Sequence, residues 1–273
     1  YNPDEDRIVP YLVKMDKFEE GKIDSLETFS YYTSHLNENA GFTILYPEDK
    51  KINDYVKKYI SDDISKFEKA LYSYDFKDIK KGYERYIDVD SWVDYYIIQE
   101  FLANNDMSSR STYLYKNATG KIVMGPVWDF NNVCDNYIRI DLRPVGFYFA
   151  TDRIWYEMLF KDKKFVNKVQ KRYKELRKSY LNEKYLITYI DETIKYLGDA
   201  IDRNFKVWGY SFDKKNQTTR IQYLYPIDRN PNSYEEAIEQ YKDFIIKRGE
   251  WLDNNIDSLK QYCHDSRNKL YVK

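Results

Sequence analysis

The chain has only two histidines, His35 and His264, and two cysteines, Cys134 and Cys263, among its 273 residues. Neither histidine has a partner at metal-ligand spacing, which argues against zinc chemistry and against a Ser-His-Asp or Cys-His centre. The two cysteines can pair or stay free, and so few say little about compartment. Any catalysis would therefore rest on carboxylates, lysine, arginine or amides, and carboxylate and amide oxygens favour Mg²⁺, Mn²⁺ or Ca²⁺.

Other absences exclude further classes of protein. With nine glycines and no G-x-G or Walker pattern, the chain has no glycine-rich phosphate loop. No run of 18 apolar residues is present, so we expect no membrane span. The 44 basic and 45 acidic residues balance, and this gives no reason to expect nucleic acid as a partner. The chain begins with Tyr1 rather than Met and shows no signal-peptide pattern, so we expect a processed or truncated product.

Hydrophobic periodicity predicts the elements of the first half of the chain. We expect, in order, a strand, an exposed polar segment, a second strand and two helices, at 8–15, 16–41, 42–46, 50–73 and about 88–104. The first helix has its apolar residues on one face. Asp88 or Asp90 can cap the second helix, which ends near Asn104.

A β-hairpin and a helical region are expected in the second half. Residues 111–116 and 121–128 are β-type runs joined around Asn117–Gly120, which predicts the hairpin. Helices are expected after Asp152, at 152–161, 163–181, 184–207 and 233–260. We therefore expect an α+β fold in which helix dominates: a small, mostly antiparallel sheet with the hairpin near the middle, and a mostly helical C-terminal half.

Two carboxylates, Asp106 and Asp129, stand at the two ends of this hairpin. A hairpin brings its ends together, so both acids can meet at one cleft, hold a divalent cation and orient a nucleophile, as phosphoryl transfer needs. Trp128 and Phe130 are expected to pack beneath while Asp129 points the other way. The alternative is plain structure: an Asp after a helix is often only a turn residue, and Trp-Asp-Phe can be a loop plug.

The residues around these carboxylates form an ordered set of motifs. They are Asp88–Trp92, then Glu100, Asn104 and Asp106, then Tyr113–Lys116, then Gly125–Phe130, and later Trp155–Tyr156 and Arg248 with Trp251–Leu252. In this order and separation they resemble the CotH kinase family, the spore-coat protein H group of atypical protein kinases. The resemblance covers roughly residues 40–260.

The resemblance implies one domain with a divergent kinase-like fold. Residues 1–48 would be the remainder of an N-terminal lobe, 49–260 a mostly helical lobe with the site hairpin at 106–132, and 261–273 a tail. We expect the N-terminal part of the family's domain, which supplies the basic residue that clamps the phosphates, to be missing from this chain. Lys14, the only lysine in the core of the first strand, is not assigned that role.

The resemblance also implies an activity. Asp106 is similar to the catalytic-loop Asp, and Asp129 to the Asp that binds the metal, with Asn131 as a further metal ligand. Asn104 and Ser111, like Asp129, would help bind the nucleotide. The cofactors would be ATP with Mg²⁺ or Mn²⁺, and the acceptor a Ser or Thr of a secreted or coat protein. The implied location is extracellular, at the cell surface or in the spore coat.

Two further departures from the family pattern, beside the missing N-terminal part, keep alternatives open. Many members have an acid where Asn131 stands, and kinases place Asn where Ser111 stands, five residues after the catalytic Asp. One alternative is a catalytically impaired module that acts as a structural, adhesion or extracellular-complex protein. Another is a Ca²⁺-stabilised domain, with oxygen donors from Asp106, Asp129, Asn131, Asn132 and Asp135.

Overall fold

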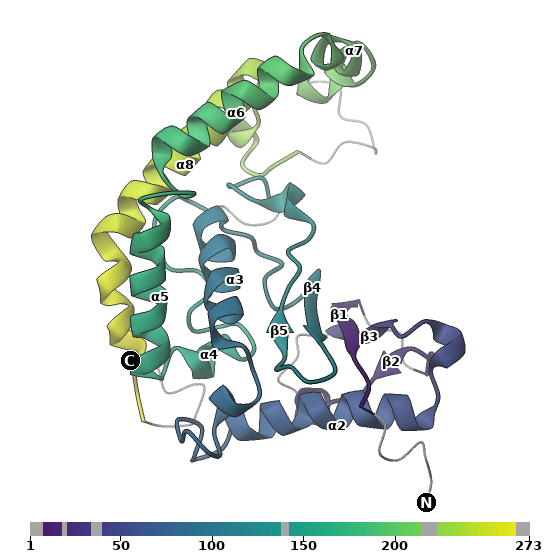
Figure 1. Ribbon diagram of the computed structural model, residues 1–273. Helices are drawn as coiled ribbons and strands as arrows, with labels where there is room; N and C mark the ends of the chain where they lie inside the picture. The colour runs from purple at the N-terminus through teal and green to yellow at the C-terminus, as the bar shows by residue number, and fades with distance from the viewer. Residues whose placement is uncertain (1–7, 18–20, 34–39, 138–141, 215–222, 266–273) are drawn as a thin grey trace, which may run out of the picture.

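A computed structural model of the chain describes residues 8–17, 21–33, 40–137, 142–214 and 223–265 (Figure 1). His35 lies outside these ranges. The described residues form a small antiparallel sheet and several helices, which confirms the predicted α+β class. No helix within these ranges is long and apolar enough to cross a membrane.

The sheet has five strands in the order β2-β3-β1-β4-β5. Their bounds are Tyr11–Lys17 (β1), Ser25–Leu26 (β2), Ala40–Tyr46 (β3), Thr112–Lys116 (β4) and Val123–Met124 (β5). Strand β1 lies between β3 and β4, with Lys14 opposite both Thr43 and Tyr113. The predicted β4–β5 hairpin exists but forms one edge of the sheet rather than its middle, because the distant strand β1 pairs with β4.

The segment 16–41 is not exposed throughout, contrary to the expectation. It contains β2 and the one-turn helix α1, Phe29–Tyr32. Leu26 and Ser30 are buried, and the backbone N–H of Ser30 donates to the buried carboxylate of Glu68 at 2.9 Å. A polar stretch can be buried in this way because its hydrogen bonds are satisfied inside the fold.

Helix α2, Asp54–Leu71, covers the face of the sheet that carries the buried side chains of Tyr11, Val13 and Met15 (Figure 1). The Asn53 side chain caps it by accepting from the Val56 N–H at 2.9 Å. Asp63 on this helix accepts hydrogen bonds from the Tyr11 hydroxyl and from Lys116 Nζ, each at 2.8 Å. Alternation along β1 leaves Lys14 and Asp16 on the opposite face, away from α2.

Helix α3, Val89–Leu102, packs between the hairpin and the C-terminal helices. Asp88, rather than Asp90, is its N-cap and accepts from the Ser91 N–H at 3.0 Å. Trp92 is fully buried and its indole N–H donates to the carbonyl of Ile122, beside the hairpin. The helix ends in Ala103, whose left-handed backbone (φ 52°) turns the chain sharply into the segment that contains Asp106.

The C-terminal half is helical, but its helix bounds differ from those expected. The helices are Tyr156–Leu159 (α4), Lys163–Leu176 (α5), Glu183–Leu197 (α6), Asp199–Trp208 (α7) and Tyr234–Asn255 (α8). The single helix expected at 184–207 is wrong, because Gly198 (φ 46°) separates α6 from α7. The helix expected at 152–161 is only one turn long, because Trp155 at φ 67° interrupts it.

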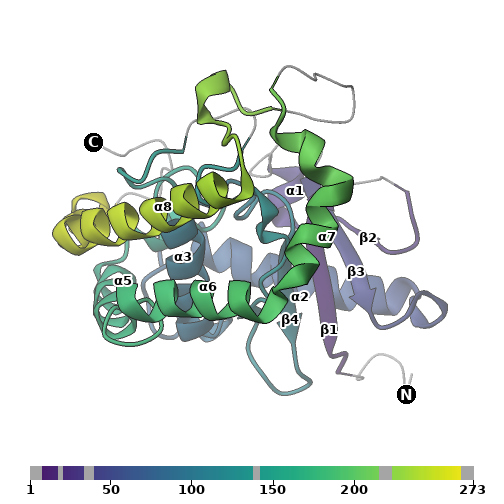
Figure 2. The same ribbon diagram turned by 90° about the horizontal axis from the view of Figure 1, so that it is seen from above.

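Helices α6 and α7 extend from the body of the domain, with α8 packed beside α6 (Figures 1 and 2). Neither α6 nor α7 contains a buried residue. The two cysteines are free thiols in this structure, which decides between the two alternatives left open by the sequence.

Candidate functional site

The loop that carries Asp106 is a tight turn anchored at both ends. The backbone carbonyl of Asp106 accepts hydrogen bonds from the backbone N–H groups of Ser109 and Arg110, at 3.1 and 2.9 Å. Asn104 is buried and its side-chain oxygen accepts from the Asp106 N–H at 3.2 Å. Met107 is fully buried beneath the loop. The backbone around Asp106 is therefore held from both sides, which suits a group that must keep its position during a reaction.

Asp129 occupies a strained backbone position. Its φ of 59° and ψ of 60° lie in the left-handed region, as does the φ of 49° at Ser111. Residues other than glycine adopt this region at a cost of about 1–3 kcal/mol each, and such residues cluster at functional sites. The conformation also breaks the strand alternation expected for Trp-Asp-Phe. Trp128 is 60% exposed and pairs with the ring of Tyr113, so its predicted burial beneath the site is wrong.

The structure brings the two predicted carboxylates into electrostatic contact. The negative charge of Asp129 acts on Asp106, and the Ser111 hydroxyl donates to Asp129 Oδ2 at 3.3 Å. Ser111 follows Asp106 on the same loop, so this bond joins the two ends of the hairpin. Ser111 and Asp129 thus lie together, as hairpin closure predicts, while the catalytic and metal-binding roles of these residues stay predictions.

The environment of Asp106 raises its pKa above the ordinary aspartate value. Partial burial is the largest cause, and the charges of Asp129 and Asp16 add to it. A hydrogen bond with Asn132 and the positive charge of Arg110 oppose the shift. A carboxylate whose pKa is raised is a better proton acceptor near neutral pH than an ordinary one. The arrangement is thus suited to taking a proton from a hydroxyl group.

Asp16 and Tyr113 border the site and were not predicted from the sequence as its members. Asp16 is at the end of β1, two residues beyond the Lys14–Tyr113 pair of the β1–β4 register, and Lys14 Nζ lies 3.5 Å from its carboxylate. Burial, then the charges of Asp16 and Asp129, raises the pKa of Tyr113. Only the pairing of strands about 100 residues apart places Asp16 here, so no local pattern could have indicated it.

The two asparagines after Asp129 play different structural parts. Asn132 is the one that contacts Asp106, although the sequence analysis gave the metal role to Asn131. Asn131 is exposed, donates to the Asn132 side-chain oxygen at 3.3 Å, and lines a neighbouring cavity. Both amide oxygens are within one turn of Asp129, which begins a short 3₁₀ helix.

One of the five oxygen donors proposed for a Ca²⁺ site, Asp135, is engaged elsewhere. The Asp135 carboxylate accepts from Arg229 Nη2 at 2.6 Å and from the Leu142 N–H at 2.7 Å, which commits it to a structural ion pair. The described residues contain no group of three or more His, Cys, Asp or Glu side chains placed to hold a metal. Two carboxylates with amide and hydroxyl oxygens suit Mg²⁺, which is usually held by one or two carboxylates plus phosphate oxygens and water.

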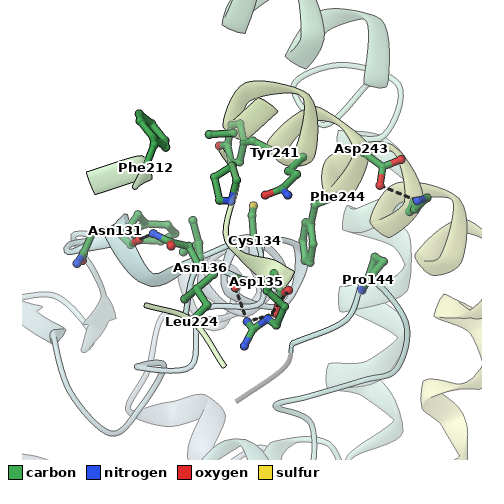
Figure 3. A pocket seen from close by; sticks show the side chains of 17 residues that line it. Asn131, Cys134, Asp135, Asn136, Pro144, Phe212, Leu224, Tyr241, Asp243 and Phe244 are labelled. Carbon is green, nitrogen blue, oxygen red and sulfur yellow. Dashed lines mark hydrogen bonds and ion pairs between the residues drawn. The ribbon is translucent and has the colours of Figure 1, made fainter. Parts of the chain in front are cut away.

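A cavity of about 650 Å³ lies beside this site (Figure 3). One wall is the segment 130–136, which starts at the residue after Asp129. The facing wall is the first half of α8, with Tyr241 and Phe244. Its size is typical of a ligand pocket. The sequence analysis did not predict this cavity, because α8 is about 100 residues away along the chain.

Comparison with known proteins gives one result for the chain as a whole. The family described as CotH kinase protein matches residues 8–252 of the 273. A search of curated proteins returned no match. The matched range includes the sheet, the Asp106 loop, the Asp129 turn and nearly all of α8. The chain belongs to the CotH kinase family.

Proposed function

We propose that the protein is a metal-dependent protein kinase that transfers the γ-phosphate of ATP to a Ser or Thr hydroxyl. The observation that carries this proposal is the pairing of Asp106, on its anchored loop, with Asp129, on its strained turn. Membership of the CotH kinase family supports it. Phosphoryl transfer needs little covalent chemistry from the protein, so two positioned acids and a bound metal can supply much of what it requires.

Each acid has its own part in the proposed reaction. Asp106 accepts a hydrogen bond from the acceptor hydroxyl, orients it and takes its proton as the phosphate is transferred. The raised pKa of this carboxyl favours that role. Asp129 would hold Mg²⁺ or Mn²⁺, with oxygens of Ser111 and Asn131 as further candidate ligands, while Asn104 fixes the loop. The metal, when bound with ATP, neutralises charge on the phosphates.

Arg110 is the cation that we propose to face the transferred phosphate. It lies on the Asp106 loop, and its charge acts on the Asp106 carboxylate. Its Nη1 is buried, with no hydrogen-bond partner among the described residues. A buried donor without a partner is costly, and binding of an anion with a small shift of the side chain would satisfy it. This would supply positive charge in a chain with no glycine-rich phosphate loop.

We also propose a domain organisation, an acceptor class and a location that agree with a kinase function. We propose a divergent kinase-like domain in which residues 1–48 belong to an N-terminal lobe and 49–260 to a helical lobe. We propose an acceptor among secreted or coat proteins, with the protein located outside the cell, at its surface or in the spore coat. These proposals rest on the family alone.

Replacement of Asp106 by Ala separates nucleotide binding from transfer. Titration with Mn²⁺-ATP should show unchanged affinity, because Asp129 remains. Transfer of labelled phosphate to a mixture of Ser- and Thr-containing peptides should fall by about 10²-fold or more, as expected for loss of a general base. Asp62→Ala, an exposed change on α2, should leave both properties intact. Normal transfer by the Asp106 variant would sink the assignment, and transfer absent from the wild type would favour a catalytically impaired binding module.

A further inference from the structure

The cavity beside Asp129 is mostly apolar. Its wall includes the aromatic rings of Phe130 and Tyr241, and more apolar side chains complete it: Val133, Pro144, Phe212, Leu224, Pro231, Ala237 and Phe244. In Figure 3 the labelled side chains of Phe212 and Leu224 lie on the side of the cavity away from Phe244, Phe212 above Asn131 and Leu224 below Asn136. A lining of this kind favours an apolar occupant, because apolar area removed from water drives binding.

The charged groups in the lining neutralise one another. Arg229 forms a bidentate pair with the Asp135 carboxylate, at 2.6 and 3.2 Å, and Lys247 pairs with Asp243 at 2.6 Å. Burial raises the pKa of Tyr241 to about 12, so its hydroxyl is neutral near pH 7. The cavity therefore has no net charge with which to select a phosphate, a nucleotide or a strongly charged peptide.

Besides the Tyr241 hydroxyl and the Cys134 thiol, the polar groups that remain are amides. Asn131, Asn136 and Gln240 line the cavity, and the Asn136 amide donates to the Asn131 carbonyl at 2.7 Å. A carboxamide carries both donors and an acceptor, which is what the N–H and C=O groups of an extended peptide require. The amides can therefore bind the backbone of a peptide, while the apolar rings can contact one of its uncharged side chains.

The position of the cavity links it to the proposed reaction. Its first wall residue, Phe130, directly follows Asp129, and its second, Asn131, precedes the residue that contacts Asp106. The Arg229–Asp135 pair holds this wall in place, with a further bond from Arg229 Nη2 to the Asp135 carbonyl at 2.6 Å. A peptide whose hydroxyl is at Asp106 can thus reach the cavity within a short stretch of extended chain.

We propose that this cavity binds the segment of the acceptor protein next to the phosphorylated Ser or Thr, with a large apolar side chain inserted. The proposal rests on the kinase function proposed above and names its substrate class: an acceptor with an aromatic or large aliphatic residue near the phosphorylated position. An acidic or basic residue in place of this apolar residue is not favoured by the cavity.

The test is selection of phage-displayed random peptides with a fixed central Ser on the immobilised full chain. The wild type should enrich peptides with Phe, Tyr, Trp, Leu or Met near the Ser. Ala237→Trp fills the cavity from α8 and should reduce recovery of those peptides at least tenfold. Ala200→Trp, a partly exposed change on α7 outside the lining, should recover them like the wild type.

Leu224→Asp is a second variant that keeps the test decisive if Ala237→Trp folds poorly. It places a charge in the apolar lining and should abolish recovery as well. Enrichment without apolar preference, or equal recovery on wild type, Ala237→Trp and Leu224→Asp, would overturn the proposal. Peptide selection needs no ATP, so failure of the proposed kinase function would appear instead in the Mn²⁺-ATP titration.

Discussion

Glu100 and Arg248 form a fully buried ion pair, with Arg248 Nη2 lying 2.6 Å from Glu100 Oε1. The same guanidinium donates to the Glu100 carbonyl at 2.9 Å and to the Gly146 carbonyl at 2.6 Å. The Glu100 carboxylate also accepts from the N–H groups of Tyr148 and Phe149. One pair thus joins the end of α3, the loop around residues 144–149 and α8, just before the turn into Asp106.

Loss of this pair should destabilise the whole domain. Arg248→Met leaves the Glu100 carboxylate buried and unpaired, which costs about 3–5 kcal/mol of unfolding free energy. Urea denaturation measures it. Arg172→Met is the matched control, because its pair with Asp94 is partly exposed and should contribute at most about 1 kcal/mol. Equal losses of unfolding free energy in the two variants would show that the buried pair does not stabilise the domain more than an exposed pair does.

Asp106 should lower stability at neutral pH. Its pKa is raised in the folded state, so ionising it is less favourable there than in the unfolded chain, and stability falls as the pH rises through the folded pKa. Asp106→Asn should therefore raise the melting temperature at pH 7. The gain should disappear toward about pH 3 and below, where the wild-type carboxyl is protonated in both states. A gain that did not change with pH would contradict this cause.

Asn132 and Asn131 should be distinguishable by the pH dependence of phosphate transfer. The bond with Asn132 lowers the pKa of Asp106, so Asn132→Ala should raise that pKa further and move the acidic limb of the rate profile to higher pH. Asn131→Ala should weaken Mn²⁺-ATP binding and leave the limb in place. The measurement is the rate with a peptide acceptor between pH 5 and pH 9 for both variants. If the two variants gave identical pH–rate profiles, Asn132 would have no separate effect on the pKa of Asp106.

Sequence reasoning predicted the local elements of the site well. The helix before Asp106 and the β4–β5 hairpin have strong periodic or turn signals, and both exist. Hairpin closure alone predicted that the loop with Asp106 and Ser111 lies beside the turn at Asp129. The burial of Trp128 was predicted wrongly because the left-handed backbone at Asp129 cannot be inferred from strand alternation.

Features that depend on distant pairing could not be predicted. Asp16 reaches the site through the β1–β4 register, and the cavity needs α8 to return beside residues 130–136. The break between α6 and α7 did leave a signal, since Gly198 interrupts an otherwise helical pattern. Arg248 and Glu100 were both named from the sequence as members of motifs, but only the fold shows that they pair.

The measurement that tests the central claim most directly is calorimetric titration of ATP with Mn²⁺ or Mg²⁺, on the wild type and on Asp129→Asn. Asp62→Asn, an exposed change of the same chemistry on α2, is the control. We predict metal-dependent binding by the wild type and the control that is lost in Asp129→Asn. Binding that Asp129→Asn retains in full, or wild-type protein that binds no nucleotide with either metal, would contradict the account.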